Sequence, residues 1–203
     1  MPAIIFGMPA TGKTTVAKRL VEISKGELTR GITCTTRPPR PGEKDGEDYF
    51  FLTPEEMHAR ISNGYFFETK YYDTAEGVWI YGTPLDLLQR DDVILILSPD
   101  RVWEIMGSPS YWALRQNCRF YFLDATDSKI TKRMIERGDE GAEIIRRVSA
   151  DRRILDAQYG AMKDQATLYL RNQTIDEMAD SIWKVESLVK RVKNQVSQEK
   201  RLT

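Results

Sequence analysis

Two glycines, a lysine and a threonine are spaced within residues 7–14 as phosphate binding requires. The segment reads Gly-Met-Pro-Ala-Thr-Gly-Lys-Thr and fits the pattern Gly-x-x-x-x-Gly-Lys-Ser/Thr of a phosphate-binding loop. Gly7 and Gly12 permit backbone conformations that side chains forbid, so backbone N–H groups can surround an anion. Lys13 supplies a positive charge to the β- and γ-phosphates, and the Thr14 hydroxyl faces a magnesium ion. The segment therefore predicts a site for a nucleoside triphosphate.

The segments on either side of this loop have the patterns that such a site needs. Residues 3–6 are a short apolar run suited to a buried strand, and residues 14–25 carry apolar side chains at helical spacing. Strand, glycine-rich turn and helix together direct a helix N-terminus at one anion. The loop residues that we expect to contact the triphosphate are Gly7, Ala10, Thr11, Gly12, Lys13, Thr14 and Thr15.

A second group suited to phosphate lies further along, where Arg37 and Arg40 flank two prolines and a third proline follows. Proline fixes φ and removes a backbone donor, so this loop is stiff and holds its arginines apart. Planar guanidinium groups bind phosphate oxygens through paired hydrogen bonds. The loop is therefore suited to clamping a second phosphate, and solvated loop charge is the alternative interpretation.

The rest of the chain alternates strand patterns with helix patterns, which indicates an α/β fold with a parallel sheet. The apolar run at 93–97 is typical of a strand covered on both faces. Capping boxes at 53–56 and 174–177 mark helix starts, and residues beyond 196 look frayed. Strands are expected at 29–36, 49–52, 65–72, 78–81, 93–97, 119–124 and 167–170, and further helices at 53–62, 84–89, 128–137 and 142–159.

Composition excludes several classes of function. Lys plus Arg and Asp plus Glu each number 30, so no net charge draws the chain to nucleic acid or an anionic membrane. No apolar run approaches the ~20 residues that span a bilayer. Cys34 and Cys118 lack metal-ligand spacing. We expect a cytoplasmic protein, monomeric or homodimeric, that binds neither nucleic acid nor membrane.

Three segments, at 35–43, 45–49 and 81–84, resemble the guanylate kinase family in their motifs and in their spacing from the first loop. A weaker resemblance extends over about residues 3–190. It implies a P-loop three-layer α/β fold with a central parallel sheet, and ATP-dependent phosphoryl transfer, with Mg²⁺, to a purine nucleoside monophosphate such as GMP or dGMP. One domain over 1–203 would comprise a core (about 1–32, 84–126 and 160–203), a mixed α/β acceptor-binding insertion (about 33–83) and a helical lid (about 127–159).

The resemblance also assigns roles to residues. Arg37 and Arg40 would bind the acceptor phosphate with the hydroxyls of Tyr49 and Tyr81. Glu68 would accept hydrogen bonds from guanine N1–H and the 2-amino group. The other assigned residues are Thr33 and Thr83 at the guanine O6, Arg133, Arg137 and Arg147 at the donor phosphates, and Asn172 near the donor adenine. Catalysis would then rest on Lys13, Arg37, Arg137 and Arg147.

The chain departs from the family where a central strand ends in two aspartates that serve the acceptor base and the magnesium environment. Ile96 and Ser98 occupy those positions, and Asp100 is displaced behind a proline. Magnesium would then rest on Thr14, nucleotide oxygens and water. The acceptor base stays open: inosinate, a deoxynucleotide or a modified purine is an alternative to guanylate.

Two other functions remain open. Some guanylate kinase-like domains are inactive scaffolds that bind phosphorylated peptides, but their phosphate loops are degraded. Here Gly7, Gly12, Lys13 and Thr14 are all present, which favours an enzyme. A phosphotransferase with another acceptor, such as a sugar phosphate, is disfavoured by the combination of Glu68 with the two tyrosines.

Overall fold

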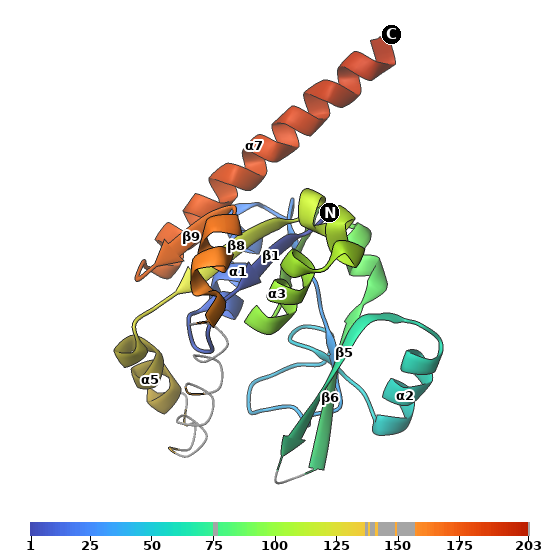
Figure 1. The fold of residues 1–203 in the computed structure, drawn as a ribbon, viewed down its shortest axis with the longest axis vertical. Helices are drawn as coiled ribbons and strands as arrows, with labels where there is room; N and C mark the ends of the chain where they lie inside the picture. The colour runs from blue at the N-terminus through green and yellow to red at the C-terminus, as the bar shows by residue number, and fades with distance from the viewer. Residues whose placement is uncertain (75–76, 137, 139–140, 142–148, 150–156, 203) are drawn as a thin grey trace.

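A computed structural model describes residues 1–74, 77–136, 138, 141, 149 and 157–202, and a five-stranded parallel sheet forms its centre (Figure 1). The strand order is β2-β7-β1-β8-β9, and every neighbouring pair is parallel. The strands are β1 (Ala3–Phe6), β2 (Thr29–Arg30), β7 (Val93–Ile96), β8 (Arg119–Asp124) and β9 (Leu168–Arg171). The three central strands are almost wholly buried because their sequences are apolar on both faces.

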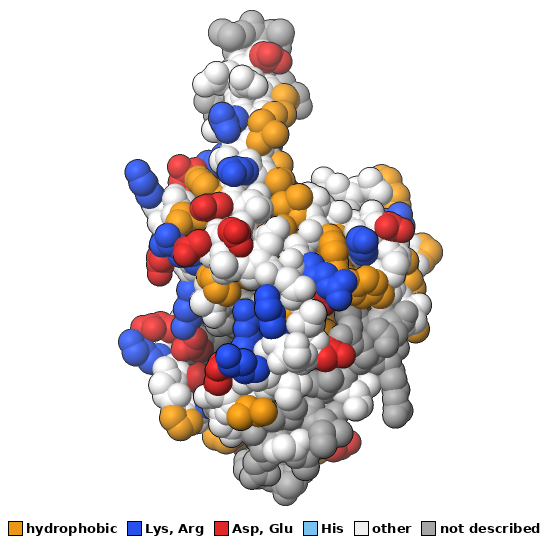
Figure 2. Space-filling view, turned by 90° about the vertical axis from the view of Figure 1, so that its left-hand side faces the viewer, with side chains coloured by type: hydrophobic (Ala, Val, Ile, Leu, Met, Phe, Trp, Pro, Cys, Tyr) orange, Lys and Arg blue, Asp and Glu red, His pale blue; other side chains and the backbone are white. Residues whose placement is uncertain are grey.

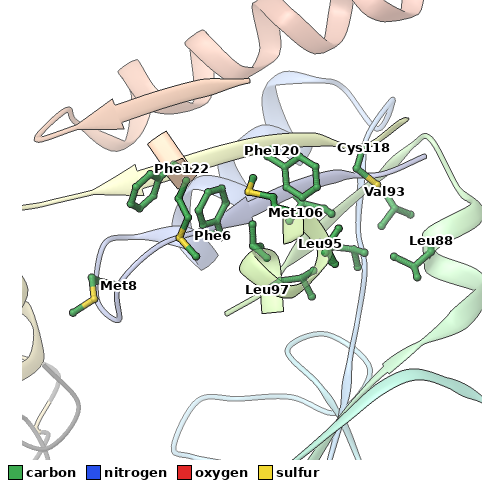
Figure 3. Close-up of a cluster of buried hydrophobic side chains, with 14 of the residues drawn as sticks. Phe6, Met8, Leu88, Val93, Leu95, Leu97, Met106, Cys118, Phe120 and Phe122 are labelled. Carbon is green, nitrogen blue, oxygen red and sulfur yellow. The ribbon is translucent and has the colours of Figure 1, made fainter. Parts of the chain in front are cut away.

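Helices cover both faces of this sheet, giving three layers. One face packs against α1 (Lys13–Ile23) and the first half of α7 (Ile175–Leu202). The other packs against α3 (Pro99–Gly107), α5 (Asp127–Glu136) and a helix over residues 157–165. In this second core, Phe6 and Phe122 stack with ring centroids 4.8 Å apart (Figure 3).

A second sheet, of order β4-β3-β6-β5, lies beside the first. It contains β3 (Cys34–Thr35), β4 (Phe50–Phe51) and the antiparallel hairpin of β5 (Phe66–Thr74) and β6 (Gly77–Pro84), with α2 (Pro54–Ser62) packed against it. Thr53 and Glu56 form the expected capping box of α2. The hairpin matters for function because it positions side chains toward the first sheet.

The strand expected at 29–36 is wrong as a single element. Its first part is β2 of the parallel sheet, and its second part is β3 of the second sheet. The chain changes sheets around Gly31, where an added Cβ would lie 2.4 Å from the Leu95 side chain. Since only glycine fits against β7 there, the tertiary contact overrides the alternating pattern.

Other boundaries also differ from expectation. Residues Leu85–Gln89 form a 3-10 helix, η1, rather than an α-helix, and α3, η2 (Pro109–Tyr111) and α4 (Trp112–Asn117) had no clear sequence signal. The helix expected at 142–159 lies almost entirely outside the described residues.

The C-terminal helix is longer than expected, because α7 continues to Leu202 rather than fraying after Val196. It begins at the predicted capping box, where the Glu177 N–H donates to Thr174 Oγ1 (3.3 Å) and the Thr174 N–H to Glu177 Oε2 (2.8 Å). Its second half extends away from the body and carries exposed apolar side chains at Leu188, Val192 and Val196 (Figure 2). No helix among the described residues is long and apolar enough to cross a membrane.

Candidate functional site

The glycine-rich loop between β1 and α1 adopts a conformation that depends on its glycines. Gly7 has φ of 145°, and a Cβ there would lie 2.0 Å from the Leu123 carbonyl oxygen. Gly12, which precedes α1, has φ of 99°. Both angles lie in regions that side chains disfavour, so this backbone is specific to the sequence. The loop lies at the carboxyl edge of the parallel sheet, where α/β proteins bind ligands.

Within the loop, Lys13 bends back toward the backbone. Its Nζ donates to the carbonyl oxygens of Gly7 (2.8 Å) and Met8 (2.7 Å). The buried Thr11 hydroxyl donates to the same Met8 carbonyl at 2.8 Å, which fixes the loop from inside. The ammonium group is therefore held at the mouth of the loop, where a phosphate could approach it.

Thr14 and Thr15 lie in the first turn of α1 and are exposed. The described residues contain no group of three or more His, Cys, Asp or Glu side chains that could hold a metal ion. The exposed Thr14 hydroxyl is an oxygen donor of the kind that Mg²⁺ prefers, and Mg²⁺ bound with a triphosphate keeps several waters and takes phosphate oxygens with few protein ligands. Thr14 is therefore suited to complete such a site through its hydroxyl oxygen.

Two residues assigned to the donor nucleotide differ in their contacts with the loop. Arg133 of α5 reaches it directly, since its Nη1 donates to the Ala10 carbonyl at 3.1 Å. Asn172 has φ of 57° and follows β9, and its side chain accepts from the Thr126 N–H at 3.2 Å. Asn172 thus braces two loops at the sheet edge. Arg137 and Arg147 lie outside the described residues.

A cavity of about 240 Å³ separates the loop from the β5–β6 hairpin. Most of the residues assigned to the acceptor line it. The lining residues are Gly7, Pro9, Lys13, Thr33, Tyr49, Glu68, Lys70, Tyr81, Gly82, Thr83, Ile96, Leu97, Ser98 and Pro99. Residues from both sheets therefore face one space.

Arg37 is buried beside this cavity with 3% of its surface exposed. Its Nε donates to the Tyr81 hydroxyl (3.1 Å), and its Nη2 donates to both carboxylate oxygens of Glu43 (2.9 and 2.8 Å). Burial opposes the charge, but the hydrogen bonds to Glu43 and Tyr81 raise the pKa of Arg37 above its ordinary value. A guanidinium group is thus positioned against Tyr81, whose side chain lines the cavity.

The other residues expected at the acceptor phosphate differ in exposure. Tyr49 packs edge-on against Tyr81, with centroids 5.9 Å apart, and burial raises the pKa of its hydroxyl, which therefore stays a donor. Arg40 is exposed and does not line the cavity; its backbone N–H donates to Glu43. Arg37, Tyr49 and Tyr81 are brought together, whereas Arg40 lies outside this group.

Glu68 lies at the other end of the cavity wall. Its Oε1 accepts from the Thr83 hydroxyl at 3.1 Å, and β5–β6 pairing sets the two residues opposite each other. Its Oε2 lies 3.0 Å from Arg101 Nε, as an ion pair without hydrogen-bond geometry. Burial raises the pKa of the Glu68 carboxyl, against the opposing charges of Arg101 and Lys70.

Sequence reasoning missed Arg101, which holds Glu68 from behind. It lies in the first turn of α3, buried to 5% exposure, with its guanidinium 4.4 Å from the Phe67 ring centroid and its Nη2 donating to the Tyr111 hydroxyl. The local sequence pattern gave no signal for α3 other than Pro99 at its start. The arginine fixes the orientation of the carboxylate in the cavity.

Sequence reasoning also missed Lys70, which lines the cavity two residues after Glu68. Strand alternation was the available signal, since residues two apart on a strand share a face. Its Nζ donates to Ser98 Oγ (2.8 Å) and forms an ion pair with Asp100. Burial opposes the charge of Asp100, but hydrogen bonds from Lys70 and Ser98 lower its pKa. Ile96 and Ser98, where the family has aspartates, both line the cavity.

The loop, the parallel sheet and the cavity together define a P-loop nucleotide-binding protein of the three-layer α/β class. The guanylate kinase family model matches residues 1–96. A guanylate kinase from Lawsonia intracellularis is 32% identical over 184 residues, covering 88% of this chain and 80% of that protein, and one from Corynebacterium diphtheriae is 33% identical over 159 residues, covering 77% and 81%. The crystal structure of guanylate kinase from Anaplasma phagocytophilum superposes with a TM-score of 0.64 at 22% identity, covering 92% of this chain and 85% of that one.

The chain belongs to the guanylate kinase family. The resemblance inferred from its motifs and the expected fold class are thereby confirmed.

Proposed function

We propose that the protein transfers the γ-phosphoryl group of ATP to a purine nucleoside monophosphate, GMP or dGMP, giving GDP or dGDP. The observation that carries this proposal is the shared cavity. Gly7 and Lys13 of the phosphate-binding loop line one side, and Glu68 and Tyr81 of the hairpin line the other. A donor phosphate on the loop and an acceptor phosphate at Tyr81 would face each other there.

The chemistry asks mainly for alignment and positive charge, because both substrates are polyanions. The Lys13 ammonium would leave the loop carbonyls for the β- and γ-phosphates. Arg37 would hold the acceptor phosphate beside the Tyr49 and Tyr81 hydroxyls. When bound, Mg²⁺ would supply further positive charge to the donor phosphates, held by the Thr14 hydroxyl, phosphate oxygens and water. No covalent enzyme intermediate is required.

Base selection would depend on Glu68, which is oriented by Thr83 and Arg101. Its carboxylate suits the N1–H and 2-amino donors of guanine, and Thr33 and Thr83 suit the O6 carbonyl. A base that lacks those donors would leave buried groups unpaired. Ile96 and Ser98 favour a second candidate, an acceptor nucleotide whose base is hypoxanthine or a modified purine. The reason is that neither side chain offers a carboxylate to the 2-amino group of guanine.

Several further assignments complete the proposal. Arg133, Arg137 and Arg147 would contact donor phosphates within a lid over about residues 127–159, and Asn172 would lie near the donor adenine. Residues 33–83 would act as the acceptor-binding insertion of a single domain. The protein would work in the cytoplasm as a monomer or homodimer, without binding nucleic acid.

The test is a coupled assay that measures ADP formation from ATP with each of a panel of ribo- and deoxynucleoside monophosphates. GMP and dGMP are expected to give the highest kcat/KM. Faster turnover of IMP would replace guanylate by the second candidate. The absence of acceptor-dependent ADP formation across the panel would overturn the enzyme assignment and leave the inactive interaction module.

A further inference from the structure

Among the described residues, three cationic side chains border the cavity between the loop and the hairpin, and each has an internal partner. Lys13 donates to carbonyl oxygens of its own loop. Arg37 binds Glu43 with paired hydrogen bonds. Lys70 binds Ser98 and Asp100. The first two are phosphate-binding groups in the proposed function, whereas Lys70 has no role there.

The register of the hairpin fixes where Lys70 lies along the cavity. Glu68 pairs with Thr83, and Lys70 pairs with Tyr81, one step further along the same face. Two residues of a strand advance about 7 Å. Lys70 is therefore displaced from the pair suited to the base toward Tyr81, which binds Arg37. That end of the cavity is the one suited to the acceptor phosphate.

The Lys70 side chain also crosses the space between the two sheets. It starts on β5 and reaches Ser98 and Asp100, at the beginning of α3. With 22% of its side chain exposed, it lines the cavity together with Lys13. Because position 98 carries a hydroxyl and position 96 an isoleucine, Asp100 is the carboxylate that holds this ammonium group there.

We propose that Lys70 is a third phosphate-binding residue of this site, whose ammonium group donates to the acceptor phosphate beside Tyr81. The inference rests on the proposed function. Bringing two polyanions together requires positive charge between them, and Lys70 reaches from the hairpin to add charge to the cavity that Lys13 also lines. Ser98 accepts a hydrogen bond that positions the ammonium group, and Asp100 competes with the phosphate for it.

A purely structural role, bridging β5 to α3, makes different predictions, which a pair of variants separates. Lys70→Met keeps the length of the side chain and removes its charge, while Asp100→Asn breaks the same ion pair from the other side. Calorimetry measures binding of GMP and of guanosine, which lacks the phosphate, to the full-length wild type and both variants. Lys70→Met is expected to weaken GMP about tenfold and to leave guanosine unchanged. Asp100→Asn is expected not to weaken GMP.

The remaining outcomes are equally informative. Lys70→Arg restores charge and should recover most of the GMP affinity. Three results would overturn the inference but not the proposed function. Lys70→Met could bind GMP as tightly as the wild type, or it could lose affinity for GMP and guanosine equally. Asp100→Asn could lose as much affinity for GMP as Lys70→Met does. Failure of the wild-type protein to bind GMP overturns the proposed function, and the inference with it. Melting temperatures of all the variants identify any loss that comes from unfolding.

Discussion

The two sides of the cavity are built in different ways. The donor side is one continuous stretch of backbone between β1 and α1, shaped by Gly7 and Gly12. The acceptor side is a set of side chains from separate elements: Arg37 from a loop, Glu68 and Lys70 from β5, and Arg101 behind them from α3. A backbone site depends on local conformation, whereas a side-chain site depends on which strands pair.

This difference has consequences for substitutions. In the proposed function, groups on the donor side would act on the phosphoryl group that moves, so their loss should reduce kcat. Groups on the acceptor side would each contact one part of the second substrate, so their loss should mainly raise the KM of that substrate. Substitutions on each side therefore test this division.

The largest effect is expected for Lys13→Ala. Removing a charge-stabilising donor costs about 10²–10³ in kcat, and the protein should stay folded because Gly7, Gly12 and the buried Thr11 hydroxyl also shape the loop. Acceptor-dependent ADP formation measures the loss of kcat, and the melting temperature shows whether the protein stays folded. Activity near that of the wild type would contradict the assignment of the loop. The control is Lys18→Ala, at an exposed position further along α1.

Glu68→Gln comes next and should affect the acceptor alone. The amide cannot accept from both guanine donors, and it removes one of the two ion pairs of Arg101, which keeps the pair with Glu104. Unpaired buried groups cost about 1–3 kcal/mol, so the KM for GMP should rise about 10- to 100-fold while the KM for ATP stays within about twofold. Glu199→Gln, on the exposed part of α7, is the matched control. Equal changes in both KM values would make Glu68 structural.

A smaller effect is expected from pH. Burial raises the pKa of Glu68, so its carboxyl takes up a proton at a higher pH than an ordinary glutamate. The acid form cannot accept from both donors, so GMP binding should weaken as pH falls through the raised pKa. The phosphate of GMP also titrates, near pH 6, but equally for wild type and Glu68→Gln. The KM of Glu68→Gln for GMP, divided by the KM of the wild type, should therefore decrease as the pH is lowered. A ratio that stays constant with pH contradicts the role of the carboxylate.

The same contrast explains what could be predicted from the sequence. The loop at residues 7–14, the capping boxes and the hairpin were predicted because each signal is local. The division of 29–36 between two sheets was not, because it depends on tertiary contacts such as the close approach of Gly31 to Leu95, which no local pattern shows. Arg101 was missed for a related reason: its partner Glu68 lies on a distant strand, and no local pattern links them.

Family motifs supplied most of the acceptor site, and they could not supply what is particular to this chain. The change at Ile96 and Ser98 was visible in the sequence, but the contact between Lys70 and Ser98 was not. Only the pairing of β5 with β6 and the position of α3 bring the lysine to Ser98. A substitution in a motif can thus be recognised from the sequence. The side chain that contacts the substituted residue can be identified only from the fold.

The smallest predicted effect tests whether the two sides belong to one cooperative unit. Thr53 caps α2 beside the second sheet, and Thr174 caps α7 against the first. Each Thr→Ala change should cost about 1 kcal/mol. If both sheets unfold together, each variant shifts the single urea transition, followed by circular dichroism, by a similar amount. A separate early transition in Thr53→Ala alone would mean that the acceptor side unfolds independently, and the donor side would then keep ATP binding at urea concentrations that abolish GMP binding.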